Sequence, residues 1–255
     1  MDDNEVIFLL LGQSNMVGRG EFHAGTNYTL PGNVYACRTS LSDKECNACE
    51  FPHPPVDTYE WKKITEEPIF DKRSDGRAGV SLTPSFIDEI QKQNDFYRIK
   101  LVPLAVGGSP LSPWEKEGKY FNHVIDTCRK LNIIGKVSCV LWHQGESDST
   151  LELSKTYKVR LTKMIEDYRM ELQQPNLLFL IGELGEFLAN NRERCPEYKS
   201  INTSIKQVIE KTPNTIFIPS TGLVDKGDKL HFSSESLKQF GIRYGKAYNE
   251  YYSSN

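Results

Sequence analysis

Short, nearly unbroken apolar runs recur along this chain, and each of them stops at a glycine or a polar residue. The first covers residues 6–11 and stops at Gly12. Because these runs lack the regular alternation of a half-exposed strand, they are typical of strands buried on both faces. The predicted strands cover residues 6–11, 99–106, 137–142, 177–181 and 215–219. They predict a sheet of about five strands with helices on both faces.

Amphipathic helices alternate with these strands. Apolar residues recur every three or four positions between the runs, as they do at Phe86, Ile87 and Ile90. The predicted helices cover residues 83–94 and the apolar stripes at 161–172, 201–208 and 237–251. Strands and helices that alternate with right-handed crossovers form a parallel sheet, so the prediction is a three-layer α/β fold.

Residues 20–78 interrupt this alternation. They are rich in proline, glycine, asparagine, cysteine and charged residues. We predict a long excursion with little regular structure, and loops of this length inside a compact domain are usually functional. The expected organisation is one domain over residues 1–255 that carries this excursion.

Charge and hydropathy disfavour nucleic acid and membranes as partners. The net charge of -3 gives no general attraction to nucleic acid or to an anionic membrane. The apolar runs are too short to span a bilayer. Residues 1–5 are acidic and lack the layout of a signal peptide, so a cytoplasmic protein is the default expectation, with secretion left open. We also expect a monomer.

The cysteines allow three interpretations. Cys46 and Cys49 have the C-x-x-C spacing, and Cys37 and His53 would complete four zinc ligands. A local disulfide is favoured over zinc, and free thiols are favoured over both in a cytosolic chain. No His-Glu-x-x-His or comparable motif accompanies them, so we expect no catalytic metal.

Polar side chains follow three of the predicted strands where these end. They are Ser14, Ser109 and Gln144. Ligands of open parallel sheets bind beyond the carboxyl ends of the strands. We therefore expect these side chains to converge on one edge of the sheet.

Ser14 and His231 form a candidate nucleophile and base. A serine directly after a strand commonly caps the next helix, but it acts as a nucleophile where a base takes its proton. Asp228 precedes His231 by three residues, so on a loop its carboxylate can turn back and fix the tautomer of the ring. An idle histidine beside a capping aspartate is the alternative.

Gly108 and Gln144 are candidate donors to an oxyanion. Glycine lets a backbone N–H approach an oxygen without a Cβ in the way, and the amide of Gln144 supplies another donor. A phosphate-binding loop is the alternative at Gly108. It is disfavoured because the segment lacks the glycine and lysine pattern of such loops.

These blocks, taken in order, resemble the SGNH hydrolases. More closely they are similar to carbohydrate esterase family six, the sialate O-acetylesterase and acetylxylan esterase group, in its short plant-type members. The blocks are Gly12-Gln13-Ser14-Asn15-Met16, Gly107-Gly108-Ser109, Trp142-His143-Gln144-Gly145-Glu146-Ser147-Asp148 and Asp228-Lys229-Leu230-His231-Phe232.

The resemblance implies a flavodoxin-like three-layer fold and a serine hydrolase without a cofactor. It implies Ser14 as nucleophile, His231 as base and Asp228 as the acid that orients His231. The implied oxyanion hole consists of Ser14, Gly108 and Gln144.

The other polar residues of the blocks receive supporting roles. Glu146 is an alternative partner for His231, or a brace that accepts backbone hydrogen bonds from the nucleophile turn. We favour Asp228 because the chain guarantees its reach. The residues assigned to substrate binding or to the turns are Gln13, Asn15, Ser109 and His143.

The implied reaction is removal of O-acetyl groups from xylan, sialic acid or related sugars, or from a small acetyl ester. Two alternatives stay open. One is an inactive carbohydrate-binding relative, and the other is an esterase or thioesterase for a small non-carbohydrate substrate. The missing G-x-S-x-G motif disfavours an α/β-hydrolase lipase.

Overall fold

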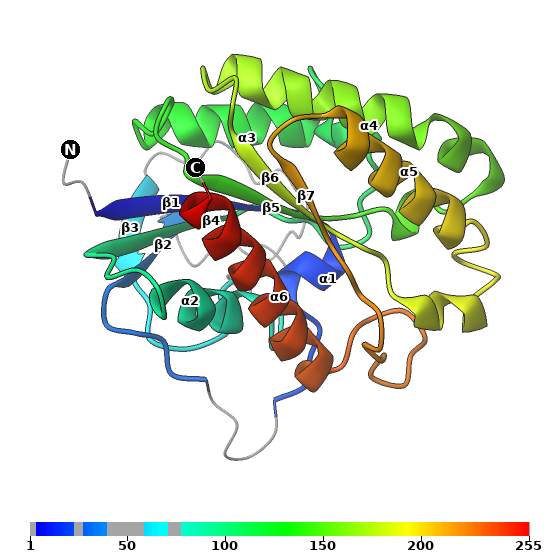
Figure 1. The fold of residues 1–255 in the computed structure, drawn as a ribbon, viewed down its shortest axis with the longest axis horizontal. Helices are drawn as coiled ribbons and strands as arrows, with labels where there is room; N and C mark the ends of the chain where they lie inside the picture. Colours follow the sequence, from blue (N-terminus) through cyan, green and yellow to red (C-terminus); the bar gives the residue numbers. More distant parts are fainter. Residues whose placement is uncertain (1–3, 23–27, 40–58, 71–77, 255) are drawn as a thin grey trace, which may run out of the picture.

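The computed structural model describes residues 4–22, 28–39, 59–70 and 78–254. The strands of this part of the chain form a single sheet (Figure 1). They are β1 (Glu5–Gly12), β2 (Val34–Thr39), β3 (Tyr59–Lys63), β4 (Arg98–Pro103), β5 (Cys139–His143), β6 (Leu178–Gly182) and β7 (Thr215–Ile218).

The sheet is parallel except at one edge. Its order over the described residues is β3-β2-β4-β1-β5-β6-β7, and only β3 runs antiparallel to its neighbour β2. The α/β class is therefore confirmed, but the predicted count of five strands is two short. Both missed strands lie within residues 20–78, where we predicted little regular structure.

Helices cover both faces of the sheet, as predicted. In Figure 1, α3, α4 and α5 lie on one face, and α1, α2 and α6 lie on the other. The helices are α1 (Ser14–Val17), α2 (Thr83–Gln91), α3 (Lys119–Lys130), α4 (Leu151–Glu171), α5 (Tyr198–Lys211) and α6 (Ser234–Ser253), with short 3₁₀ turns η1 (Ser112–Trp114), η2 (Glu146–Asp148) and η3 (Glu186–Asn190). α3 is missing from the predicted elements, although its buried residues recur at helical spacing.

The core lies between the central strands and the helices. All residues of β5 and β6 are buried, as the apolar runs predict. On one face, the ring of Phe8 packs edge-on against Phe86 of α2 and Tyr248 of α6, at centroid distances of 4.9 and 5.3 Å. Because α6 begins directly after the loop that carries His231, this packing also anchors one side of the candidate site.

The described residues bear on the expectations for the cysteines, for a metal site and for a membrane span. Cys37, Cys128, Cys139 and Cys195 are free and buried, whereas Cys46, Cys49 and His53 lie outside the described residues. In the described ranges, no group of three histidine, cysteine or acidic side chains is arranged to hold a metal ion. None of the described helices is long and apolar enough to cross a membrane.

Candidate active site

Ser14 lies directly after β1, at the first position of α1. The turn before it requires Gly12, whose φ is +127° and where a Cβ would lie 2.1 Å from the carbonyl oxygen of His143. The N–H of Gln13 donates to the same oxygen at 2.9 Å and holds the turn against β5. Ser14 is thus fixed at the carboxyl edge of the sheet.

A histidine and a carboxylate from the far end of the chain form a row with Ser14. Its Oγ lies 3.0 Å from Nε2 of His231, and Nδ1 of His231 lies 2.7 Å from Oδ2 of Asp228. Because the carboxylate accepts the proton on Nδ1, Nε2 is the acceptor for the serine hydroxyl. The cap position of α1 is Gln13, so a capping role for Ser14 does not fit.

The loop that carries His231 also orients Asp228. Its Oδ1 accepts hydrogen bonds from the N–H groups of Leu230, at 2.9 Å, and His231, at 2.8 Å. Burial acts to raise the pKa of the Asp228 carboxyl, but the hydrogen bonds from the His231 N–H, the His231 ring and the Leu230 N–H outweigh it and lower that pKa. Asp228 is therefore ionised at neutral pH.

Glu146 contacts a different set of side chains. Its Oε1 accepts a hydrogen bond from Nδ2 of Asn15 at 2.6 Å and lies 3.7 Å from Nδ1 of His143. The ring of His231 has Asp228 at its Nδ1 instead. Glu146 does brace the nucleophile turn, but through the side chain of Asn15 and not through backbone N–H groups.

Asn15 connects the nucleophile turn to the loop of the base. Its Oδ1 accepts from the N–H of Phe232 at 3.1 Å, and its Nδ2 donates to the carbonyl oxygen of Leu230 at 3.2 Å. These two residues flank His231. The contacts of Asn15 therefore set the separation of nucleophile and base.

Gln144 is not placed as an oxyanion donor, which corrects the prediction. Its side chain is fully buried, and its Nε2 donates to the carbonyl oxygen of Ser109 at 3.1 Å and to Oδ2 of Asp148 at 2.6 Å. Its Oε1 accepts from the hydroxyl of Tyr157 at 3.0 Å. The amide turns into the interior because these partners satisfy it there.

Gln13 presents an amide where Gln144 was expected to. Its Oε1 accepts from the N–H groups of Gly145 and Ser147, each at 3.4 Å. Since two donors face the oxygen, the NH₂ group must point the other way, and it has no hydrogen-bond partner among the described residues. Gln13 lines the pocket at Ser14.

Gly108 lies at the same pocket as Ser14. Its φ is +73°, a conformation that favours glycine. Within the described part of the chain, the N–H groups of Gly108 and Ser14 donate to no other backbone group. Both are therefore available to an oxygen bound in the pocket.

Ser109 and His143 belong to the supporting structure and not to the pocket. The Oγ of Ser109 donates to the carbonyl oxygen of Val106 at 2.8 Å and accepts from Nε1 of Trp114 at 2.9 Å. His143 is fully buried, its Nε2 lies 3.3 Å from the carbonyl oxygen of Glu183, and burial lowers the pKa of its ring. The predicted contact of these two residues with substrate is therefore not supported.

The pocket at the nucleophile is small, with a volume of about 200 Å³. Its lining residues are Gln13, Ser14, Gly108, Glu146, Ser147, Arg194, Cys195, Leu230 and His231. Burial raises the pKa of the Cys195 thiol to about 12, so this side chain stays protonated and is a poor nucleophile. The size suits a short acyl group.

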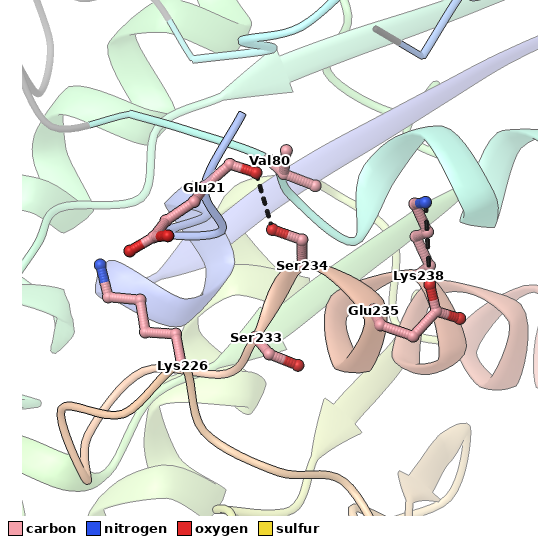
Figure 2. A pocket seen from close by; sticks show the side chains of 7 residues that line it. All are labelled: Glu21, Val80, Lys226, Ser233, Ser234, Glu235 and Lys238. Carbon is pink, nitrogen blue, oxygen red and sulfur yellow. Dashed lines mark hydrogen bonds and ion pairs between the residues drawn. The ribbon is translucent and has the colours of Figure 1, made fainter. Parts of the chain in front are cut away.

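A second pocket, of about 350 Å³, lies on the loop that carries Asp228 and His231 (Figure 2). It receives Lys226 and Ser233 from this loop, and Figure 2 shows Ser234 donating to the carbonyl oxygen of Glu21. Lys226 also lies 3.9 Å from Oδ2 of Asp228. Among the described residues that line this pocket, none is a serine with a histidine base at its hydroxyl, whereas the pocket at Ser14 has both.

Arg194 is a pocket residue that we did not predict. It is exposed, it lines the pocket beside Ser14 and His231, and it forms no ion pair within the described residues. It lies in an irregular segment after η3, outside every motif block. Its sequence context therefore carries no signal that relates it to the site.

Comparison with known proteins assigns the family. A family model described as carbohydrate esterase, sialic acid-specific acetylesterase, matches residues 4–250. The probable carbohydrate esterase At4g34215 of Arabidopsis thaliana is 27% identical over an alignment of 252 residues that covers 95% of this chain and 89% of that protein. Its solved structure superposes with a TM-score of 0.75 at 23% identity and covers 97% of this chain and 98% of that chain.

Two further solved structures share the fold. XAC1771, a carbohydrate acetylesterase from Xanthomonas citri, superposes with a TM-score of 0.72 at 18% identity, over 98% of this chain and 57% of that chain. NanS superposes with a TM-score of 0.71 at 14% identity, over 99% of both chains. The fold and the family model together confirm the resemblance read from the motif blocks. This chain belongs to the carbohydrate esterase family of sialic acid-specific acetylesterases, which are carboxylic ester hydrolases.

Proposed function

We propose that this protein removes acetyl groups from O-acetylated sugars through an acetyl-enzyme intermediate on Ser14. The observation that carries the proposal is the row of Ser14, His231 and Asp228, joined by contacts of 3.0 and 2.7 Å at a pocket of acetyl size. Membership of a carbohydrate esterase family supports a sugar as the acyl carrier.

The proposed reaction has two halves. In the first, Oγ of Ser14 bonds to the acetyl carbonyl carbon while Nε2 of His231 takes the hydroxyl proton. The carbon–oxygen bond to the sugar then breaks, and His231 returns the proton to the departing sugar oxygen. In the second half, His231 takes a proton from water while the water oxygen bonds to the acetyl carbon. The bond from this carbon to Oγ of Ser14 then breaks, His231 returns the proton to Oγ, and acetate leaves. Asp228 stabilises the imidazolium in both halves.

Three donors would stabilise the oxyanion that forms in each half. They are the N–H groups of Ser14 and Gly108 and the side-chain NH₂ of Gln13. All three line the pocket and have no competing partner among the described residues. Donors held ready for a developing negative charge are usually the largest contribution to acyl transfer.

Acetate release tests the proposed function. The purified protein is offered a panel of O-acetylated sugars and a simple acetyl ester, and free acetate is measured over time. We expect turnover of acetylated sugars, with a better kcat/KM than for the simple ester. Binding of these sugars without any acetate release would instead identify an inactive carbohydrate-binding protein.

Gln13 provides a test of the oxyanion hole. We expect Gln13→Ala to lower kcat by about 10²–10³-fold with little change in KM, because the lost donor acts on the transition state. Gln13→Glu keeps an oxygen for Gly145 and Ser147 but turns a carboxylate oxygen toward the oxyanion, so its rate should fall at least as far. Initial rates over a range of substrate concentrations measure both constants. A raised KM at unchanged kcat would make Gln13 a substrate-binding residue instead.

Arg194 favours a sugar that carries a carboxylate. The family description names sialic acid, which is such a sugar. A guanidinium binds a carboxylate with two parallel hydrogen bonds, and the guanidinium of Arg194 has no ion-pair partner among the described residues. We therefore include acidic O-acetylated sugars as the preferred substrate class.

The preference is measured with an O-acetylated sugar acid and its methyl ester, which differ only in charge at the carboxyl group. Arg194→Gln should raise KM for the free acid by roughly 10-fold or more and change the methyl ester little, since a hydrogen bond to a charged group contributes about 1.5–3 kcal/mol. Arg192→Gln is the matched control, because Arg192 is exposed two residues away and does not line the pocket. Equal effects of both variants would reduce the role of Arg194 to general attraction of anions.

A further inference from the structure

Asp148 is a fully buried carboxylate behind the turn that presents Gly108. Its Oδ2 accepts two hydrogen bonds, from the N–H of Leu111 at 2.8 Å and from Nε2 of Gln144 at 2.6 Å. Its Oδ1 has no hydrogen-bond partner and lies 3.6 Å from the guanidinium of Arg160. A buried polar group is costly unless it is hydrogen-bonded, and Oδ2 of Asp148 makes two such bonds.

Both hydrogen bonds connect Asp148 to the residues that follow Gly108, which form the far side of the turn. Leu111 follows Gly108 by three residues, and Asp148 holds its N–H directly. Gln144, held by Asp148, donates to the carbonyl oxygen of Ser109, the residue directly after Gly108. Asp148 thus contacts this turn once directly and once through Gln144.

The near side of the turn, at Val106 before Gly108, is fixed by other groups. The N–H of Val106 donates to the carbonyl oxygen of Gly12 at 2.9 Å, and both the N–H and Oγ of Ser109 donate to the carbonyl oxygen of Val106, at 3.3 and 2.8 Å. This side ties the turn to β1, on which the nucleophile depends. Among the hydrogen bonds of the described residues, none ties Ser109–Leu111 to β1, and Asp148 joins this side of the turn to the residues after β5.

We propose that Asp148 is a positioning residue of the oxyanion hole, which acts through Leu111 and Gln144 to hold the N–H of Gly108 toward the pocket. The inference rests on the proposed function, because it concerns the donors of that same site. Asp148 itself contacts no substrate. A displacement of about 1 Å in a catalytic group typically costs on the order of 10²-fold in rate, so loss of these hydrogen bonds should lower kcat.

The charge of Asp148 is not what the proposed role requires. Arg160 is paired at 3.0 and 2.6 Å with Glu115, and it reaches Asp148 only at 3.6 Å. An asparagine whose oxygen replaces Oδ2 keeps both hydrogen bonds. Asp148→Asn should therefore keep the kcat that Asp148→Ala loses.

The experiment compares kcat, KM and inhibition by methylboronic acid in both variants and in wild type. The boron forms a tetrahedral adduct with Oγ of Ser14 that places an oxygen in the oxyanion hole. For Asp148→Ala we expect kcat to fall roughly 10–10²-fold, KM to stay within about 2-fold and the inhibition constant to rise in parallel with the loss of kcat. Asp148→Asn should stay close to wild type. Asp167→Ala, which removes a buried carboxylate from α4, is the control for loss of a buried charge elsewhere.

Folding is checked by circular dichroism and Tm. If Asp148→Ala does not fold, Gln144→Met removes the hold on Ser109 while Asp148 keeps Leu111, and the same parallel loss is expected. A folded variant with wild-type kcat, or a loss of kcat without weaker methylboronic acid binding, would overturn the inference. Wild-type protein without esterase activity would instead overturn the proposed function itself.

Discussion

Ser14→Ala is expected to abolish ester hydrolysis and to leave the fold intact. Removal of a triad nucleophile typically costs roughly 10⁴-fold or more in kcat, because the hydroxyl that forms the acyl-enzyme is lost. The Cys195 thiol in the same pocket is held protonated and cannot substitute. The stability should change little, since Oγ of Ser14 makes its hydrogen bond to His231, on a partly exposed loop. Acetate release gives the rate, and Tm gives the stability.

Ser234→Ala is the matched control for this variant. Ser234 lies in the neighbouring pocket, and its Oγ donates to the carbonyl oxygen of Glu21 at 2.9 Å. Its removal should leave kcat unchanged. Near wild-type turnover by Ser14→Ala would remove Ser14 from the mechanism, whatever the control does.

Asp228→Asn is expected to lower kcat by about 10⁴-fold. The asparagine oxygen can keep the hydrogen bonds from the N–H groups of Leu230 and His231. Its NH₂ group then faces Nδ1 of the His231 ring and favours the tautomer with the proton on Nε2. That tautomer cannot accept the hydroxyl proton of Ser14. Because the loop contacts survive, we expect Tm to stay close to that of wild type.

Glu146→Gln is the comparison for Asp228→Asn. Glu146 supports Asn15 and does not contact the base, so its loss should cost less rate and more stability. Its other oxygen, Oε2, is buried and has no hydrogen-bond partner. Kinetics and melting curves of both variants decide between the carboxylates. An inactive but fully stable Glu146→Gln beside an active Asp228→Asn would exchange their roles.

The fold was predictable where burial dictates composition. The run at residues 6–11 became β1 because a strand buried on both faces admits few polar residues. The edge strand β3 has the sequence Tyr-Glu-Trp-Lys-Lys and is only partly buried, so it carries no such run. It pairs antiparallel with β2, whose paired residues lie some twenty or more positions earlier in the sequence, so no local pattern indicates the pairing. This is why residues 20–78 were assigned little regular structure.

The candidate site was predictable where the chain itself brings residues together. Asp228 and His231 share one loop, and their spacing allows the contact that the structure has, although the spacing alone also fits an idle histidine. The two glutamines could not be told apart in this way, because each lies next to the end of a central strand. The amide of Gln144 turns into the interior because it forms hydrogen bonds there with Asp148 and Tyr157. Gln13 faces the pocket because the N–H groups of Gly145 and Ser147 donate to its Oε1.

The central claim is that the acetyl group passes through Ser14, and a trapped intermediate tests it most directly. The protein is mixed with an acetylated sugar, the reaction is quenched in acid during turnover, and the peptides are analysed by mass spectrometry. We expect the mass of one acetyl group on the peptide that contains Ser14, and its disappearance once substrate is exhausted. An acetyl group on another residue, or steady acetate release in a Ser14→Ala variant, would contradict the account.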